Sequence, residues 1–206
     1  MQCPDEELAQ RWKDGDISAF EALFRRYERR VLNVAARMIG SVDDAEDLTQ
    51  ETFIRAHKRI RGYRGGRFCT WLFRIAANLC VDYARRRRPA TCSLEDLVEQ
   101  ADWQQSDGGA GDPEDALIRK EFSESVWATL ASIPPHYRVL LVLRHIDGMS
   151  YEEIARVIGC TRGALGVRLH RAREVFRQRM RPLLEGGGGS ASDEMQRGKA
   201  KDIPAL

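Results

Sequence analysis

The segment 150–181 (SYEEIARVIGCTRGALGVRLHRAREVFRQRMR) restricts the possible folds more than any other stretch of this chain. Ser150 followed by Glu153 has the sequence of a capping box, which marks the N-terminus of a helix. Gly159 suits the left-handed backbone position at which a helix ends. A second helix is expected from about Thr161, with a buried stripe at spacings of three and four formed by Leu165, Leu169, Ala172, Phe176 and Met180. The segment therefore predicts a helix-turn-helix.

The remaining face of this second helix is strongly basic. Its arginines, opposed only by Glu174, are Arg162, Arg168, Arg171, Arg173, Arg177, Arg179 and Arg181. A basic second helix is typical of a helix-turn-helix that enters the major groove of DNA. An ordinary helical hairpin with a solvated basic face is the alternative that this segment alone leaves open.

The formal net charge of +2 conceals an uneven distribution of charge along the chain. Residues 25–88 hold sixteen Lys and Arg against seven Asp and Glu, and residues 119–185 hold twelve against seven. Residues 89–118 hold eight acidic residues and no basic one. Two basic blocks joined by an acidic segment predict two domains that bind a polyanion. Because residues 89–113 are also poor in large apolar side chains, we expect a flexible linker there.

The rest of the chain predicts helices and no strands, because its apolar residues recur at helical spacing and do not alternate. The expected helices cover about residues 5–12, 18–39, 43–60, 70–88, 114–133 and 137–145. Ser18 and Glu21 predict a capping box for the second of them. Asp44, Asp47 and Glu51 share an outward face of the third, where they either complement the helix dipole or bind a basic partner.

A basic, glycine-rich loop (RGYRGGRFC, residues 61–69) precedes the fourth predicted helix. Tyr63 and Phe68 are expected to be exposed, because glycine and arginine surround them. Exposed aromatic rings beside arginines suit stacking on unpaired bases. Trp71, by contrast, is expected to pack in the core. The polar side of the helix that follows carries Arg74, Asn78, Asp82, Arg85 and Arg86.

Several patterns are missing from the sequence. The N-terminus lacks the apolar core of a signal peptide, and no run of about eighteen apolar residues occurs, so we expect neither export nor a membrane span. The five cysteines are scattered without a CxxC pair, which favours reduced thiols over a zinc site or disulfides. We therefore expect a cytoplasmic protein without metal or cofactor.

Two motifs resemble a known family. Residues 44–60 (DAEDLTQETFIRAHKRI) and 68–88 (FCTWLFRIAANLCVDYARRRR) are similar to region 2 of bacterial sigma factors. Residues 133–173 (IPPHYRVLLVLRHIDGMSYEEIARVIGCTRGALGVRLHRAR) are similar to region 4 of the compact extracytoplasmic-function group. The resemblance covers roughly residues 18–180, includes no third sigma domain, and implies an all-α fold of two small domains joined by a flexible acidic linker. The implied divisions are a region 2 domain at 1–88, a linker at 89–113, a region 4 helix-turn-helix domain at 114–185 and a flexible tail at 186–206.

The resemblance also implies partners and sites. Core RNA polymerase would bind through the clamp helices of its largest subunit and its flap, with the clamp helices meeting Asp44, Asp47, Gln50 and Glu51. The minus-ten promoter element would bind as a single strand with a flipped base to Tyr63, Arg64, Arg67, Phe68, Arg74 and Asn78. Phosphates would meet Arg85 and Arg86. The minus-thirty-five duplex would be read by Thr161, Arg162, Arg168, Arg171 and Arg173. The resemblance further implies an anti-sigma factor, and a linker that passes toward the RNA exit path.

One stretch departs from the family pattern. The family often has GTVKSRLHRAR where this chain has GALGVRLHRAR. Gly166 removes a basic contact and costs about 1 kcal/mol of helix propensity. Ala164 and Val167 remove hydroxyls, although both side chains suit contact with a thymine methyl. We therefore expect the same mode of docking on DNA but a different sequence preference.

Two other classes of protein were weighed against a non-catalytic sigma factor. A one-component helix-turn-helix regulator would bind duplex DNA as a dimer. It needs a ligand pocket or dimerisation helices in the N-terminal half, which the arginine-rich loop fits poorly. An enzyme would have to use the acidic cluster Asp43, Asp44, Glu46 and Asp47 as metal ligands. These residues begin a helix, and no histidine or second cluster accompanies them.

Overall fold

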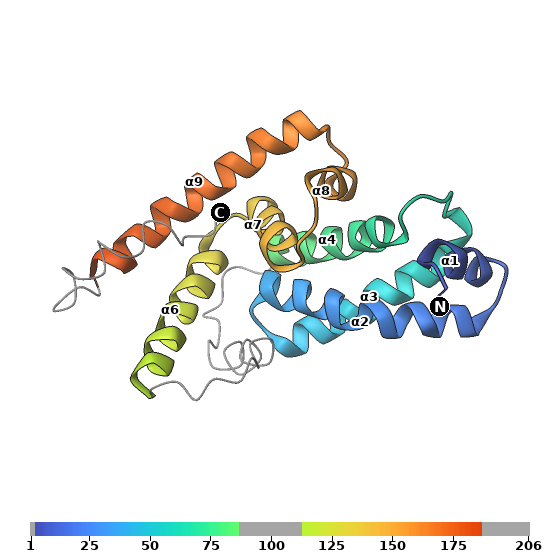
Figure 1. Ribbon diagram of the computed structural model, residues 1–206, viewed down its shortest axis with the longest axis horizontal. Helices are drawn as coiled ribbons and strands as arrows, with labels where there is room; N and C mark the ends of the chain where they lie inside the picture. The colour runs from blue at the N-terminus through green and yellow to red at the C-terminus, as the bar shows by residue number, and fades with distance from the viewer. Residues whose placement is uncertain (1–2, 87–112, 187–206) are drawn as a thin grey trace.

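The computed structural model describes residues 3–86 and 113–186, and all regular structure within these ranges is helical (Figure 1). Almost all of the predicted linker and tail lie outside the described residues. Within the described ranges, no helix is both long enough and apolar enough to cross a bilayer.

Four α-helices form the N-terminal half of the structure. They are α1 (Asp5–Lys13), α2 (Ile17–Ile39), α3 (Val42–Arg59) and α4 (Phe68–Arg86), with a single 3-10 turn η1 (Ile60–Gly62) after α3. Each begins and ends within a few residues of the predicted range. The predicted capping box of Ser18 and Glu21 is wrong, because Asp16 caps α2 and accepts hydrogen bonds from the backbone amides of Ser18 and Ala19. Because this aspartate stands two residues before Ser18, the helix begins at Ile17.

The C-terminal half holds the helix-turn-helix. Its elements are α6 (Pro113–Ser132), α7 (Pro135–Leu141), the π-helical turn η3 (Val142–Ile146), α8 (Tyr151–Ile158) and α9 (Arg162–Gly186). Both halves of the predicted capping box are present, since Ser150 and Glu153 each accept from the other's backbone amide. Gly159 ends α8 at φ 75°, a left-handed conformation that favours glycine. Along α9, four residues of the predicted stripe (Leu165, Leu169, Ala172 and Met180) are buried, and the fifth, Phe176, is half-buried.

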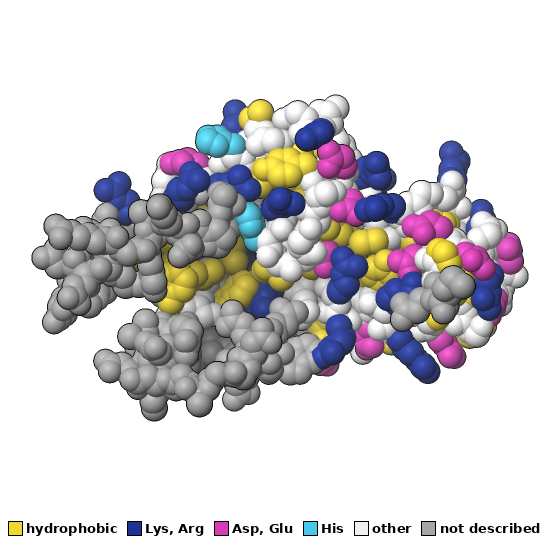
Figure 2. Space-filling model, viewed as in Figure 1, with side chains coloured by type: hydrophobic (Ala, Val, Ile, Leu, Met, Phe, Trp, Pro, Cys, Tyr) yellow, Lys and Arg dark blue, Asp and Glu magenta, His cyan; other side chains and the backbone are white. Residues whose placement is uncertain are grey.

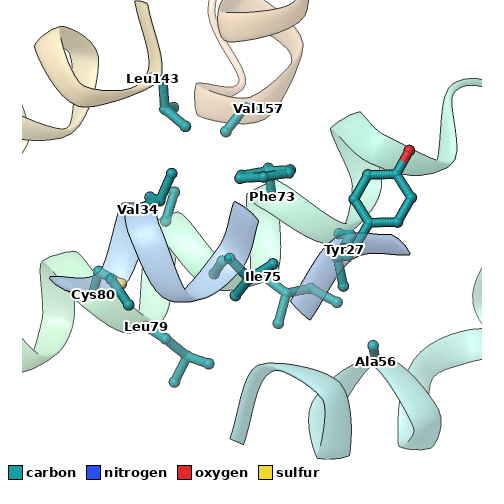
Figure 3. Close-up of a cluster of buried hydrophobic side chains, with 14 of the residues drawn as sticks. Tyr27, Val34, Ala56, Phe73, Ile75, Leu79, Cys80, Leu143 and Val157 are labelled. Carbon is teal, nitrogen blue, oxygen red and sulfur yellow. The ribbon is translucent and has the colours of Figure 1, made fainter. Parts of the chain in front are cut away.

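The two halves pack together through a shared apolar core rather than lying apart. In Figure 3, Leu143 and Val157 of the C-terminal half point toward Val34 and Phe73 of the N-terminal half, and all four are buried. The sequence predicts two small helical domains joined by an acidic linker, and in the structure these two domains also share one buried cluster. The reason lies in α4, which buries side chains on more sides than α2 and α3 can cover. Its uncovered apolar side is closed by α7 and α8.

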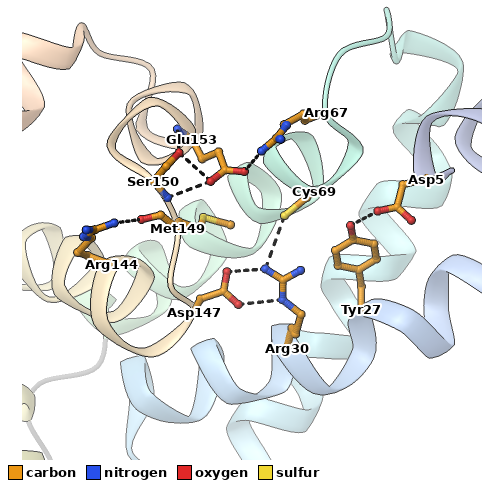
Figure 4. A network of polar contacts seen from close by, with 10 residues as sticks. All are labelled: Asp5, Tyr27, Arg30, Arg67, Cys69, Arg144, Asp147, Met149, Ser150 and Glu153. Atoms are coloured by element: carbon orange, nitrogen blue, oxygen red, sulfur yellow. Dashed lines mark hydrogen bonds and ion pairs between the residues drawn. The ribbon is translucent and has the colours of Figure 1, made fainter.

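Polar contacts fix the orientation of the two halves (Figure 4). Arg30 of α2 donates two hydrogen bonds to Asp147, at 3.0 and 2.9 Å, and the Asp147 side chain is only 4% exposed. Burial raises the pKa of Asp147, and the Arg30 guanidinium opposes part of that rise. Arg37 of α2 also lies over the Trp127 ring of α6, 4.0 Å from its centroid. Because a buried charge pair requires matched geometry, the Arg30–Asp147 pair favours one relative orientation of the two halves over other ways of packing them.

Candidate nucleic-acid and partner-binding surfaces

The first candidate surface is the acidic start of α3. Ser41 caps the helix by accepting from the amide of Asp44. Asp47 and Gln50 are exposed, whereas Asp44 and Glu51 are half-buried. Glu51 forms an ion pair with Arg55 one turn along, at 2.6 Å. All four acidic-face residues named from the sequence therefore lie on one accessible side of α3, facing away from its buried Ala45, Leu48, Thr52 and Ala56.

The loop before α4 differs from its prediction. Tyr63 is 3% exposed and Phe68 is fully buried, so the expected exposure of both rings is wrong. Gly65 and Gly66 adopt φ of 86° and 85°, and this turn folds the rings inward. The Tyr63 hydroxyl donates to the carbonyl of Gly66. Phe68 then sits among other rings, with centroids 5.5 Å from Tyr27, 5.7 Å from Trp71 and 6.2 Å from Trp12.

The basic residues of the loop and of α4 divide into two groups. Arg67 forms an ion pair with Glu153, and Arg74 donates to the carbonyls of Arg156 and Val157. Both arginines therefore contact α8, where Arg74 satisfies carbonyls of the last turn. The backbone amide of Ser150 lowers the pKa of Glu153, with smaller contributions from the Ser150 hydroxyl and Arg67. The second group consists of Arg64, Arg85 and Arg86. These arginines are exposed, as are Arg67, Arg74 and the uncharged Asn78 of α4.

A basic cleft of about 820 Å³ brings residues of both halves together. Six arginines line it, namely Arg55, Arg59, Arg74, Arg85, Arg168 and Arg171. Trp71, half-buried against the core, also lines the cleft together with Asn78. Asp82 is the one acidic residue among the lining residues. Of the predicted minus-ten residues, Arg74 and Asn78 line this cleft, and of the predicted minus-thirty-five residues, Arg168 and Arg171 do.

The N-terminal half of α9 is open to solvent. Thr161 caps it by accepting from the amide of Ala164 at 3.2 Å. Arg162 is exposed and forms an ion pair with Glu152 at 2.9 Å. Arg168 and Arg171 are exposed, whereas Arg173 is half-buried on another side of the helix. Figure 2 shows basic side chains along the upper part of this face, over α7, α8 and α9.

Sequence reasoning missed the residues that join the two halves. Arg30 and Asp147 carry no local signal, because 117 positions separate them in the chain. Arg138 was also missed, although it donates to the carbonyl of Met38 in α2. Arg55 and Arg59 of α3, which line the basic cleft, were not among the predicted site residues. Their spacing of four places both on one side of α3, and that spacing was the available signal for the cleft.

Comparison with known proteins identifies the family. The model of Sigma-70 region 2 matches residues 23–90, and that of Sigma-70 region 4 matches residues 123–175. The ECF RNA polymerase sigma-E factor of Escherichia coli is 36% identical over 190 residues, which cover 89% of this chain and 97% of the relative. The RNA polymerase sigma-H factor of Pseudomonas aeruginosa is 36% identical over 87% of this chain and 95% of its own. The chain therefore belongs to the sigma-70 family of RNA polymerase sigma factors, in its extracytoplasmic-function group.

Solved structures agree with this assignment. CnrH, in complex with the cytosolic domain of CnrY, aligns with a TM-score of 0.63 and 25% identity, covering 89% of this chain and 99% of CnrH. The sigma factor RpoE of Bartonella quintana, in complex with the anti-sigma factor NepR, aligns with a TM-score of 0.55 and 22% identity over 79% of this chain and 96% of its own. At 22% identity, the similarity to RpoE supports the fold and nothing further.

Proposed function

We propose that this protein binds core RNA polymerase as its sigma subunit and directs it to promoters, without catalytic activity of its own. The observation that carries the proposal is the presence of region 2 and region 4, in that order, in one chain. The partners are core polymerase and promoter DNA, and the place of action is the cytoplasm, where that polymerase works. A one-component regulator is less well supported, because the matched relatives are sigma factors along almost their whole length.

Polymerase binding is assigned to the acidic side of α3. Asp47 and Gln50 are exposed there, and Asp44 and Glu51 flank them. Because the inward side of α3 is buried in the core, this side is available to a basic partner. The clamp helices of the largest polymerase subunit are the partner that the family resemblance implies. The flap of the polymerase would meet the region 4 domain.

Promoter binding is assigned to two basic surfaces. Arg64, Arg67, Arg74 and Asn78 would bind the single-stranded minus-ten element, and Arg85 and Arg86 its phosphates. Tyr63 and Phe68 would support the loop from within. Duplex DNA at the minus-thirty-five element would meet α9 through Thr161, Arg162, Arg168 and Arg171, because this end of the helix is open.

The packed arrangement has a consequence for promoter binding. Arg67 and Arg74 contact α8 in this structure, so the minus-ten strand and α8 compete for the same two guanidinium groups. The acidic side of α3, in contrast, stays accessible. Polymerase binding would therefore precede separation of α8 from α4, and promoter contact would follow.

Control by an anti-sigma factor is part of the proposal. Both structural neighbours were solved in complex with another protein, CnrY for CnrH and the anti-sigma factor NepR for RpoE. By analogy, a partner that holds the two halves together would keep Arg67 and Arg74 from DNA.

Gel-shift experiments test the proposed function. With a promoter duplex, the protein alone is expected to bind weakly, and the protein with core polymerase to bind strongly. Tight duplex binding by the protein alone, unchanged by core polymerase, would instead support a one-component regulator.

A further inference from the structure

The basic cleft between the two halves carries more positive charge than the described residues neutralise. Arg55 pairs with Glu51, and Arg74 donates to carbonyls of α8. The other four arginines of the cleft are exposed and make no hydrogen bond or ion pair with another described residue; they are Arg59, Arg85, Arg168 and Arg171. Asp82 is the one acidic residue among the lining residues. An anion is therefore the ligand that this surface favours.

These four arginines come from both halves of the structure. Arg59 belongs to α3 and Arg85 to α4, whereas Arg168 and Arg171 belong to α9. Packing of the halves brings like charges together, and an anion bound among them offsets their repulsion. An anion that contacts both walls binds the packed form more tightly than the separated form, and it therefore stabilises the packed form by mass action. The cleft thus couples anion binding to the packing of the halves.

The size of the cleft and its aromatic residues indicate the kind of anion. The volume of about 820 Å³ lies within the range of about 300–1,000 Å³ that is usual for small-molecule pockets, which often lie between domains. Trp71 and Tyr137 line the cleft and are half-buried. The Trp71 ring packs on Phe68, with centroids 5.7 Å apart, and the Tyr137 ring packs on His136, with centroids 4.2 Å apart. Because arginines bind phosphate groups through paired hydrogen bonds and aromatic rings stack on bases, the cleft suits a small molecule that has both phosphates and a base.

We propose that this cleft binds a nucleoside polyphosphate, and that the bound nucleotide holds the two halves in the packed arrangement. Its phosphates would lie among Arg59, Arg168 and Arg171 and so join α3 to α9. Its base would lie beside Trp71 and Tyr137. The inference does not depend on the proposed function. Its consequence for that function is that the nucleotide opposes separation of the halves.

Single-stranded DNA is the competing occupant, because it carries the same chemical groups. The two ligands differ in their effect on packing. A nucleotide bound across the cleft stabilises the packed halves, whereas the minus-ten strand competes with α8 for Arg67 and Arg74 and therefore separates them. The nucleotide is favoured because all four of the exposed cleft arginines are brought together only while the halves are packed.

Isothermal titration calorimetry of the full-length protein with ATP and with GTP tests the proposal. At least one of the two nucleotides is expected to bind saturably, and inorganic tripolyphosphate to bind about tenfold more weakly, because the stacked base is lost. Raising the salt concentration should weaken binding, since exposed charges are screened. The bound nucleotide should raise the thermal midpoint without increasing the radius of gyration. The proposal would be overturned if neither nucleotide bound saturably, if tripolyphosphate bound as tightly, or if nucleotide increased the radius of gyration.

Variants in the two halves test whether the nucleotide bridges them. Arg59→Ala in α3 and Arg168→Ala in α9 are each expected to weaken nucleotide binding about tenfold, because each removes one guanidinium group from the phosphates. Arg25→Ala is the matched control, since Arg25 is exposed on α2 and does not line the cleft. Circular dichroism should show parental folding for all three variants, because the three side chains are exposed. Weaker binding by only one of the two cleft variants, or by neither, would overturn the bridging site.

Discussion

Single charged side chains carry most of the proposed recognition, and their surroundings decide what each can do. Asp47 is exposed with no hydrogen bond or ion pair to another described residue, so its charge is available to a partner. Asp147 is buried against Arg30, so its charge serves the structure instead. Arg168 lies in the open cleft with several other arginines and without a carboxylate partner among the described residues. Residues of the same type therefore differ in role, depending on whether the side chain is buried and whether its charge is paired.

Asp47→Arg is expected to weaken binding to core polymerase at least tenfold without lowering thermal stability. The change replaces an exposed charge of the acidic face with one of opposite sign, which repels a basic partner. Titration of labelled protein with core polymerase measures the loss. Glu6→Arg, an exposed charge reversal on α1, is the control and should bind normally. Unaltered affinity of Asp47→Arg would remove the acidic face from the polymerase interface.

Arg168→Ala is expected to cost about 1–3 kcal/mol of holoenzyme binding at one base position, if its guanidinium pairs bidentately with a guanine. Binding should be measured against promoters substituted at each position of the minus-thirty-five element. Similar losses on every sequence would make Arg168 a phosphate contact. Arg177→Ala, further along α9 and paired with Glu174, is the comparison.

At the level of helices, local sequence was a good guide. Helix ends could be predicted because caps are short-range, as Ser150, Glu153 and Gly159 show. The conformation of the loop before α4 could not be predicted in the same way, because its glycines permit a turn in either direction. The direction of the Tyr63 and Phe68 rings depends on the aromatic cluster around Phe68. The acidic face of α3 was found from spacing alone. The sequence could not predict the basic cleft itself, because its walls come from helices that are far apart in the chain.

Glycine substitutions test the helix-turn-helix at this scale. Gly159→Ala is expected to destabilise the protein by about 1 kcal/mol or more, because φ of 75° is strained for alanine. Gly166→Ala is expected to stabilise it by about 1 kcal/mol, since Gly166 lies within α9 and an added methyl meets no atom within 4 Å. Urea unfolding measures both. Equal effects of the two substitutions would contradict the assigned backbone conformations.

In the whole molecule, packing of the two halves determines which surfaces are available. The shared apolar core and the Arg30–Asp147 pair join them, and both features depend on contacts between residues far apart in the sequence. Composition indicated two basic blocks and an acidic segment, but it could not show that helices of both halves pack against α4. The accessible surface that results is acidic on α3, while Arg67 and Arg74 contact α8.

Asp147→Asn is expected to favour separation of the halves by about 1–3 kcal/mol, because one of two charge-assisted hydrogen bonds is lost at a buried site. Small-angle scattering should show a larger radius of gyration. Binding to single-stranded minus-ten DNA should increase, since Arg67 and Arg74 become free. Glu152→Gln, which breaks only the exposed pair with Arg162, is the control. Unchanged scattering and DNA binding for Asp147→Asn would mean that this pair does not hold the halves together.

Sequencing the 5′ ends of transcripts made in vitro from genomic DNA tests the central claim most directly. Core polymerase with this protein is expected to start at a defined set of sites that share two upstream elements at a fixed spacing, and core polymerase alone is not. Start sites and yields that are the same with and without the protein would contradict its assignment as a promoter-specificity subunit.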